Sequence, residues 1–298
     1  MELHQLRYFA AIARTGSFSR AAEHCHVSQP SLSQQIAKLE KQLDQRLFDR
    51  LGRRVLLTDA GRLLLERAEA ILTAVADAER RLRDAGNQDG GRLAVGAIPT
   101  IAPYLLPRAL QRFVRRHPNV ELTVEEDVTQ HLLETTAAAE LDLAILALPL
   151  DDPRLHVEPL LTEPLLLALP AGHRLARRRR VAVDDLHEER FILLSEMHCL
   201  GEQVLSFCRT NGCQPRIACR SAQIGTVQAL IALGQGVSLL PAMARRAGER
   251  GIVYRALAGS PARTLAVAWH RHRYHSLAAE QFLADLRALC PRLAEPDA

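Results

Sequence analysis

Apolar positions in the first part of the chain recur at helical spacing, and two polar turns interrupt them. The first set predicts one helix and consists of Leu3, Leu6, Tyr8, Phe9 and Ile12. Residues 15–17 end this pattern, and Ser17 is a suitable N-cap for a short second helix. Ser28 ends the next turn and is suited to cap a third helix, with Pro30 in its first turn. The pattern therefore predicts three helices joined by tight turns.

The third helix has one apolar face and one polar face. Its inward stripe is expected to contain Leu32, Ile36, Leu39 and Leu43. The outward residues carry amides, hydroxyls and an ammonium group: Gln29, Ser31, Ser33, Gln34 and Lys38. Such side chains fit a DNA major groove, where glutamine binds adenine edges and serine contacts bases or phosphates. The run 50–58 that follows predicts a β-wing with three arginines for phosphates: Arg50, Arg53 and Arg54.

A long helix is predicted to begin at Asp59. Apolar residues repeat along it with coiled-coil spacing, at Leu65, Ala68, Leu72, Val75 and Leu82. Two interpretations fit this seam: the helix packs on its own domain, or it pairs with a second copy of the chain. We favour the dimer, with contacts at Leu65, Leu72, Val75 and Leu82, because a palindromic DNA site needs two reading domains. Residues 86–91 then predict a hinge.

Beyond this hinge, short strand-like runs alternate with helical stretches. The strands are predicted at 93–96, 120–124, 141–148, 191–194, 237–240 and 265–269. This alternation favours an α/β fold with a mostly parallel sheet. Ligands of such folds bind at the carboxyl ends of the strands. Thr100, which follows the first of these strands, therefore marks a candidate ligand position.

Charge is concentrated in the N-terminal part of the chain. Residues 1–58 hold nine Lys or Arg and five Asp or Glu, and 9 − 5 gives +4. Since the formal net charge of the whole chain is also +4, the remaining residues are neutral. A basic part on a neutral remainder is typical of a nucleic-acid-binding domain. The arginine run 177–180 is a rival basic patch, which we expect to be a solvated loop.

Two of the six cysteines have a spacing that suggests redox chemistry. Cys199 and Cys208 are 208 − 199 = 9 positions apart, and residues 201–208 between them have helical character. A helix holds such residues roughly 13 Å apart, whereas the Cα atoms of a disulfide are about 5.5 Å apart. The two thiols can therefore bond only if the helix unwinds. Oxidation would then change the conformation of the protein.

The N-terminal pattern resembles the winged helix-turn-helix of the LysR-type transcriptional regulators. The residues that carry this resemblance are Leu6, Phe9, Ser17, Phe18, Ala21, Ala22, Ser28 to Ser33, Ile36, Leu39, Glu40, Leu43, Leu47, Phe48, Arg50, Thr58 and Gly61. The remainder is similar to the effector domain of that family, which has two Rossmann-like lobes like those of periplasmic solute-binding proteins. The implied fold is α/β, with a winged helix-turn-helix, a long linker helix and this two-lobed domain.

The resemblance also implies domain boundaries. The DNA-binding domain would span 1–58, the linker or dimerisation helix with its hinge 59–90, and the effector domain 91–298. Within the effector domain, lobe I would comprise about 91–160 and 259–298, and lobe II about 161–258.

Within this family, the effector half is most similar to the regulators that sense hydrogen peroxide. The matching segments are 98–100, 103–107, 141–148, 198–200, Gln203, 207–208 and 239–242. The resemblance implies that Cys199 reacts with peroxide and that Cys208 then forms a disulfide with it. Groups expected to bind peroxide or activate the thiol are Thr100, Thr129, His198 and Arg263. Met197 replaces the glycine often found before His198 in this family. Cys213 and Cys219 are further thiols that compete with Cys208 for the role of resolving cysteine.

The chemistry of peroxide reduction favours the same groups. A thiolate attacks the O–O bond, and the nearby positive charge of Arg263 or of a protonated His198 would lower the pKa of Cys199. A second thiol captures the sulfenic acid before further oxidation becomes irreversible. This predicts a transcriptional regulator that controls oxidative-stress genes through a Cys199–Cys208 switch.

Two alternative functions share parts of this pattern. In one alternative, the thiols are inert and the regulator responds to a small metabolite bound between the two lobes. A solute-binding protein would need an export signal and no DNA-binding domain, the reverse of what the sequence has. No nucleophile elbow, zincin motif or phosphate-binding loop is present, so we expect no enzyme activity, no cofactor and no metal.

The expected partners follow from this interpretation. They are double-stranded operator DNA, further copies of the chain in a homodimer or homotetramer, RNA polymerase, and a reducing system such as glutaredoxin or thioredoxin. The chain starts without a basic and then apolar leader, and its apolar stretches near 143–150 and 165–169 are too short to cross a bilayer. We therefore expect a cytoplasmic protein with no membrane contact.

Overall fold

The computed structural model describes residues 1–51, 54–86, 90–195, 199–245, 248 and 250–294. The chain divides into two compact units. The first comprises Met1–Ala85 with His272–Tyr274, and the second comprises Gly86–Arg271 with His275–Ala298. No helix in the described part of the chain is both long and apolar enough to cross a membrane.

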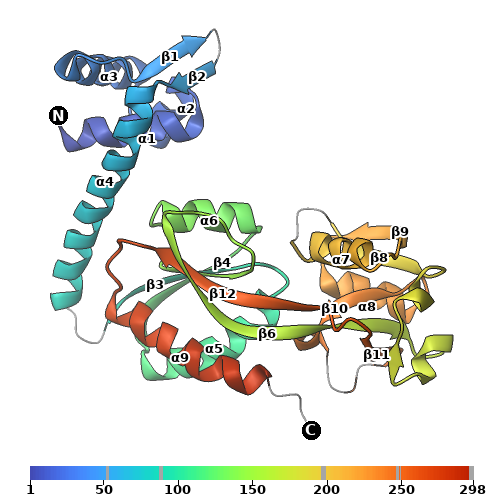
Figure 1. The fold of residues 1–298 in the computed structure, drawn as a ribbon. Coiled ribbons are helices and arrows are strands. Elements are labelled where there is room, and N and C mark those ends of the chain that lie inside the picture. Colours follow the sequence, from blue (N-terminus) through green and yellow to red (C-terminus); the bar gives the residue numbers. More distant parts are fainter. Residues whose placement is uncertain (52–53, 87–89, 196–198, 246–247, 249, 295–298) are drawn as a thin grey trace. The chain divides into compact units, whose positions relative to one another are not determined.

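The N-terminal unit contains the predicted helices, wing and long helix (Figure 1). Its elements are α1 (Leu3–Thr15), α2 (Phe18–His24), α3 (Gln29–Leu43), β1 (Phe48–Leu51), β2 (Arg54–Leu57) and α4 (Asp59–Gly86). Strands β1 and β2 form an antiparallel pair, as expected for a wing. The hydroxyl of Ser17 accepts a hydrogen bond at the start of α2, and that of Ser28 does so at the start of α3. Both predicted N-caps are therefore confirmed.

The apolar stripe of α3 is shorter than the sequence suggested. Leu32, Ile36 and Leu39 are fully buried in the core of this unit. Leu43 is 36% exposed, so its predicted inward position is wrong. It is the last residue of the helix, and Asp44 then adopts a left-handed φ of 51° that turns the chain away. Three apolar residues are therefore sufficient to dock α3.

The second unit contains two lobes, each with its own apolar core. Lobe I is built from β3 (Gly90–Ala97), α5 (Ala102–Arg116), β4 (Asn119–Glu126), α6 (Thr129–Ala137), β5 (Leu143–Ala147) and α9 (Leu277–Ala294). Strands β4, β3 and β5 are parallel neighbours. Helix α6 covers one face of this sheet, and α5 and α9 lie together on the other face (Figure 1).

Two long strands connect the lobes. β6 (Leu155–Pro170) and β12 (Ala262–His270) pair antiparallel and run from one lobe into the other (Figure 1). The strand β12 also pairs antiparallel with β5. The expectation of a mostly parallel sheet is therefore wrong, and the sheet is mixed. The physical reason is β12, which returns the chain from lobe II to lobe I between β5 and β6 and runs antiparallel to both.

Lobe II continues from the far end of β6. Its further elements are η1 (Arg174–Arg177), β7 (Arg180–Val181), η2 (Asp184–Leu186), β8 (Arg190–Leu194), α7 (Cys199–Thr210), β9 (Arg216–Ser221), α8 (Ile224–Ala232), β10 (Ser238–Pro241), η3 (Ala242–Ala244) and β11 (Ile252–Leu257). β10 and β11 pair antiparallel with β6, while β8 and β9 form a separate parallel pair. The core of lobe II lies between these strands and helices α7 and α8.

Helix α7 carries both candidate redox cysteines, and its helical conformation confirms the prediction made for 201–208. A Cβ atom at Gly201 would lie 2.6 Å from the carbonyl oxygen of Leu194, so glycine is required for the helix to approach the end of β8 this closely. The Nε2 atom of Gln203 donates a hydrogen bond of 2.9 Å to the carbonyl oxygen of Leu148 in lobe I. The first turns of α7 are thus held against both lobes.

Candidate functional site

The polar face of α3 is accessible in the N-terminal unit. Gln29, Ser31, Gln34 and Lys38 are exposed, and Ser33 is half-buried. The three buried residues of α3 point to the opposite side, into the core. This places the predicted DNA-contacting side chains on one helical face, as a helix that enters a major groove requires.

The wing and the long helix are described less completely. The strands of the wing are described, but Arg53 and the side chains of Arg50 and Arg54 lie outside the described residues. Along α4, Leu65 and Leu72 pack partly against the core of their own unit, whereas Leu82 is 76% exposed. The seam thus divides into two parts. The inner part packs against its own domain, and the outer part is exposed and available for contact with a second chain. Val75 lies between them and is half-buried.

A buried ion pair holds Arg263 in place between the lobes. Its guanidinium lies 2.7 Å from the carboxylate of Glu163, and both side chains are almost completely buried. The Nη1 atom of Arg263 also donates a hydrogen bond of 2.8 Å to the hydroxyl oxygen of Thr100, and Nη2 donates one of 3.1 Å to the carbonyl oxygen of that residue. The carboxylate of Glu163 further accepts a hydrogen bond of 3.1 Å from the backbone N–H of Met243.

Two of the three residues in this buried cluster were predicted from the sequence. Thr100 and Arg263 were predicted to lie together, and the structure places them in direct contact. Glu163 was missed. Its signal was a carboxylate within the apolar run 160–169, since an acidic residue in a buried strand needs a partner there. In the structure Glu163 and Arg263 are paired across β6 and β12.

Cys199 is the first residue of α7 and lies next to this ion pair. It is half-buried and packs against the core of lobe I, although α7 belongs to lobe II. The hydroxyl of Thr129 and the backbone N–H groups of Cys199 and Leu200 form hydrogen bonds to its sulfur. These bonds and the charge of Arg263 favour the thiolate, but burial outweighs them and raises the pKa of Cys199.

The expected lowering of this pKa is therefore not what the structure shows for the reduced state. Arg263 does lower the pKa of Cys199, as predicted, but less than desolvation raises it. The same guanidinium is paired with the buried carboxylate of Glu163. His198, the other predicted activating group, lies outside the described residues. The thiol is thus protonated at neutral pH and is surrounded by groups that stabilise its anion once it forms.

Cys208, at the other end of α7, has a different environment. It is completely buried in the core of lobe II, and so is Cys213. The two thiols form a hydrogen bond with each other, and burial raises the pKa of Cys208 to about 12. The remaining cysteines are Cys25 and Cys219, which are half-buried, and Cys290, which is buried in the core of lobe I.

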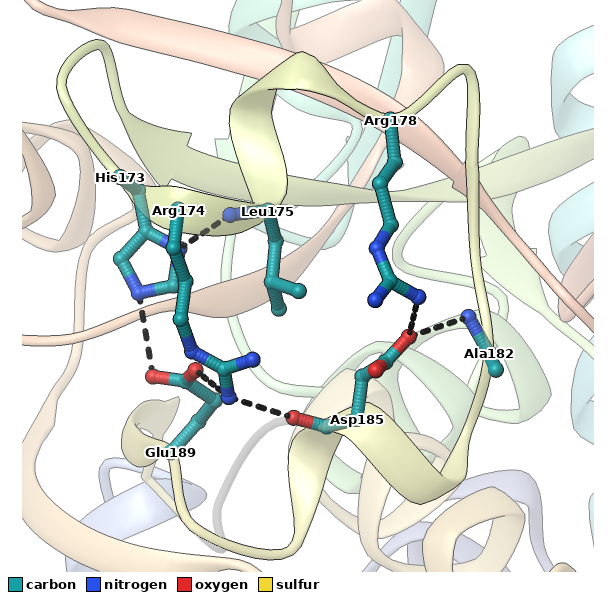
Figure 2. Close-up of polar contacts among 7 residues, drawn as sticks. All are labelled: His173, Arg174, Leu175, Arg178, Ala182, Asp185 and Glu189. Carbon is teal, nitrogen blue, oxygen red and sulfur yellow. Dashed lines mark hydrogen bonds and ion pairs between the residues drawn. The ribbon is translucent and has the colours of Figure 1, made fainter.

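The rival basic patch forms internal contacts. Arg178 is paired with Asp185 at 2.7 Å, and the same carboxylate accepts a hydrogen bond from the backbone N–H of Ala182 (Figure 2). Arg180 donates a hydrogen bond of 3.0 Å to Ser260. Two of the four arginines of the run 177–180 therefore form internal contacts in lobe II. The run is exposed, as expected, but only 178–179 lie in a loop, since Arg177 ends η1 and Arg180 begins β7.

Comparison with known proteins accounts for both units. Residues 3–62 match the family described as bacterial regulatory helix-turn-helix protein, lysR family, and residues 86–291 match the LysR substrate binding domain. The chain belongs to the LysR family. It is therefore a DNA-binding transcription regulator, and the resemblance stated from its N-terminal pattern is confirmed.

Relatives cover nearly the whole chain. An uncharacterised HTH-type transcriptional regulator, YcgK of Bacillus subtilis, is 37% identical over 95% of this chain and 93% of its own. The hydrogen peroxide-inducible genes activator of Pectobacterium carotovorum is 37% identical over 93% of this chain and 95% of its own. Among solved structures, full-length OxyR of Pseudomonas aeruginosa with a cysteine-to-aspartate substitution is 32% identical, with a TM-score of 0.70 over 97% of this chain and 94% of that one. The similarity to OxyR-type regulators is confirmed.

Proposed function

We propose that this LysR-family regulator senses hydrogen peroxide through Cys199 and reports it by a Cys199–Cys208 disulfide. The observation that carries this proposal is the environment of Cys199, with Thr129, two backbone N–H groups and Arg263 around one half-buried sulfur. Relatives named as hydrogen peroxide-inducible genes activators support it. The proposed output is control of oxidative-stress genes.

The groups around Cys199 suit the attack of a thiol on peroxide. As the sulfur loses its proton, the Thr129 hydroxyl and the N-terminal N–H groups of α7 stabilise the negative charge that develops. Thr100, whose hydroxyl oxygen accepts from Arg263, has its own O–H left to donate to a peroxide oxygen. Peroxide is then cleaved, with one oxygen on Cys199 as a sulfenic acid and the other released as water.

The second step needs a conformational change. Cys208 lies at the opposite end of the helix that begins at Cys199, in the core of lobe II. A disulfide between them therefore requires α7 to unwind and to leave its contacts with Leu194 and Leu148. Unwinding removes α7 from both lobes, and this is how oxidation would be transmitted to the rest of the protein.

The regulator is proposed to act as a homodimer or homotetramer on operator DNA. Exposed residues of α3, above all Gln29 and Ser31, would contact bases, while the wing arginines contact phosphates. The outer part of α4 with Leu82 would contact a second chain. RNA polymerase, and glutaredoxin or thioredoxin as reductant, are the further partners of this proposal.

The test compares DNA footprints of the reduced and peroxide-treated protein. The wild type is expected to change its footprint, and Cys199→Ser is expected to keep the reduced footprint at every peroxide dose. Cys219→Ser, a half-buried thiol of the same lobe, is the matched control and should respond like the wild type. A Cys199→Ser protein that still responds would contradict the proposal and would favour a regulator whose effector is a small metabolite.

A further inference from the structure

The geometry points to Cys213 as a third redox residue. It attacks Cys208 in the Cys199–Cys208 disulfide, forms a Cys208–Cys213 disulfide, and so ends the signal. This inference rests on the proposed function, because it needs that disulfide as its starting point. It concerns a different event, the decay of the oxidised state. The observation behind it is that the backbone N–H of Cys213 donates a hydrogen bond of 2.8 Å to the carbonyl oxygen of Cys208, and both residues lie in the same buried core.

Backbone and side-chain contacts hold the two residues together. Cys213 donates its backbone N–H to the carbonyl oxygen of Cys208 at 2.8 Å, and their thiols form a hydrogen bond with each other. Helix α7 ends at Thr210, and Gly212 with its φ of 73° turns the chain so that Cys213 lies beside Cys208. Both side chains lie in the core of lobe II with no solvent exposure.

The two possible disulfides of Cys208 differ in how much of the native packing of α7 they disrupt. A Cys199–Cys208 bond cannot form while α7 is helical, since the helix holds these residues roughly 13 Å apart. Forming this bond therefore disrupts the buried packing of Leu200 and Val204 on the same helix. A Cys208–Cys213 bond links neighbours at the end of α7 and leaves that helix intact. Native packing thus favours exchange toward the second bond.

The exchange is chemically balanced. The thiolate of Cys213 attacks the sulfur of Cys208, the Cys199–Cys208 bond breaks, and Cys199 leaves as a thiolate. The proton lost by Cys213 is available to Cys199. Over the whole sequence one molecule of hydrogen peroxide and the two thiols of Cys208 and Cys213 give one disulfide and two molecules of water.

Direct oxidation of this pair by peroxide is slow in the reduced protein. Both thiols are buried, and burial raises their pKa values, that of Cys208 to about 12. Unwinding of α7 would remove this protection and expose Cys213 only five positions from the new disulfide. Cys199 therefore starts the sequence, and Cys213 acts only after Cys208 has moved.

Trypsin separates the two disulfides cleanly. Cleavage after Arg190, Arg209 and Arg216 yields peptide 191–209 with Cys199 and Cys208, and peptide 210–216 with Cys213. A Cys199–Cys208 disulfide lies within peptide 191–209 and lowers its mass by two hydrogens. A Cys208–Cys213 disulfide joins peptide 191–209 to peptide 210–216. Cys219 lies in a third peptide, 217–220.

The experiment treats full-length reduced protein with a brief pulse of peroxide, removes the oxidant, alkylates samples over time without reductant, and maps the peptides. In the wild type the internal disulfide is expected first and the cross-linked pair later, while Cys199 becomes alkylatable again. In Cys213→Ser the internal disulfide should persist at least tenfold longer. Cys219→Ser should follow the wild type, and Cys199→Ser should give neither product.

Each outcome separates the two proposals. If the internal disulfide forms and persists equally in the wild type, Cys213→Ser and Cys219→Ser, the role of Cys213 is refuted and the peroxide switch stands. If it forms in none of them, including Cys213→Ser, the proposed function itself fails. Cross-linking of peptide 210–216 in Cys199→Ser would show that the buried pair reacts directly and would also overturn the inference. Reduced Cys213→Ser must bind DNA like the wild type, and Cys213→Ala provides a second variant if it does not.

Discussion

The two ends of helix α7 place the same functional group in opposite environments. Cys199, at the start, is half-buried among hydrogen-bond donors and a guanidinium. Cys208, near the end, is completely buried in an apolar core beside another thiol. Since the residues are chemically identical, the difference in reactivity comes from the fold. One thiol is arranged to meet a small oxidant, and the other is kept from it until the helix moves.

The largest expected effect comes from removing the charge that faces Cys199. Arg263→Ala leaves the buried carboxylate of Glu163 without its partner, and breaking such a pair costs about 3–5 kcal/mol. Chemical denaturation should show this loss. Replacing both partners, in Arg263→Met with Glu163→Gln, should restore much of the stability but not the rate of Cys199 oxidation. Equal stability of the Arg263→Ala protein and the wild type would contradict the buried pair.

A smaller effect is expected from loosening the first turn of α7. Gly201→Ala places a Cβ atom 2.6 Å from the carbonyl oxygen of Leu194, and such overpacking costs about 1–3 kcal/mol. Because native docking of α7 competes with the disulfide, this variant should form the Cys199–Cys208 bond faster after oxidation. Gly225→Ala, in helix α8 with nothing within 4 Å, is the matched control and should not be destabilised. Disulfide formation is followed by the mass of peptide 191–209.

The pH dependence of the thiols should reveal the same contrast. Burial raises the pKa of Cys199, so its thiolate is scarce at pH 7 and grows about tenfold per pH unit up to that raised value. Alkylation of Cys199 in native protein should therefore still accelerate above pH 8.5, the ordinary thiol value being about 8.5. Cys208, with a pKa of about 12 and no exposure, should remain unmodified over this range. A rate for Cys199 that levels off near pH 6 would show a lowered pKa instead.

The smallest effect concerns a single hydrogen bond to the sulfur. Thr129→Val removes the hydroxyl that stabilises the Cys199 thiolate, at about 1 kcal/mol, which corresponds to roughly fivefold slower oxidation. Thr226→Val, at an exposed position of α8, serves as a control and should leave the rate unchanged. Stopped-flow measurement of peroxide consumption would compare the two. Equal rates for both variants would remove Thr129 from the site.

Periodicity and capping predicted the N-terminal unit almost completely. Ser17 and Ser28 begin helices as expected, because an N-cap is a local interaction between a side chain and the next turn. Leu43 was misplaced because burial at a helix end depends on what covers it. In the second unit the six predicted strands are present, but β6, β7, β9 and β11 were missed. The antiparallel course of β6 and β12 was not predictable, since the pattern of apolar residues does not fix strand direction.

The residues of the candidate site were predicted well, but the direction of the Cys199 pKa shift was not. Resemblance supplied Cys199, Thr129 and Arg263, and the structure brings these residues together. The sequence could not show that Glu163, a hundred positions away, neutralises Arg263, because that pairing arises from the contact of β6 with β12. It also could not show that Cys213 touches Cys208. Contacts of this kind depend on the fold, and burial within that fold is the largest cause of the raised pKa of each thiol.

The contrast between the two ends of α7 is tested most directly by finding which sulfur is oxidised first. Reduced Cys208→Ser protein is treated with one equivalent of hydrogen peroxide in the presence of a reagent that traps sulfenic acids, and the tryptic peptides are mapped. The trapped adduct is expected on Cys199 in peptide 191–209, with Cys213 and Cys219 unlabelled. An adduct on Cys213 or Cys219 with Cys199 intact would contradict the assignment of Cys199 as the residue that meets peroxide.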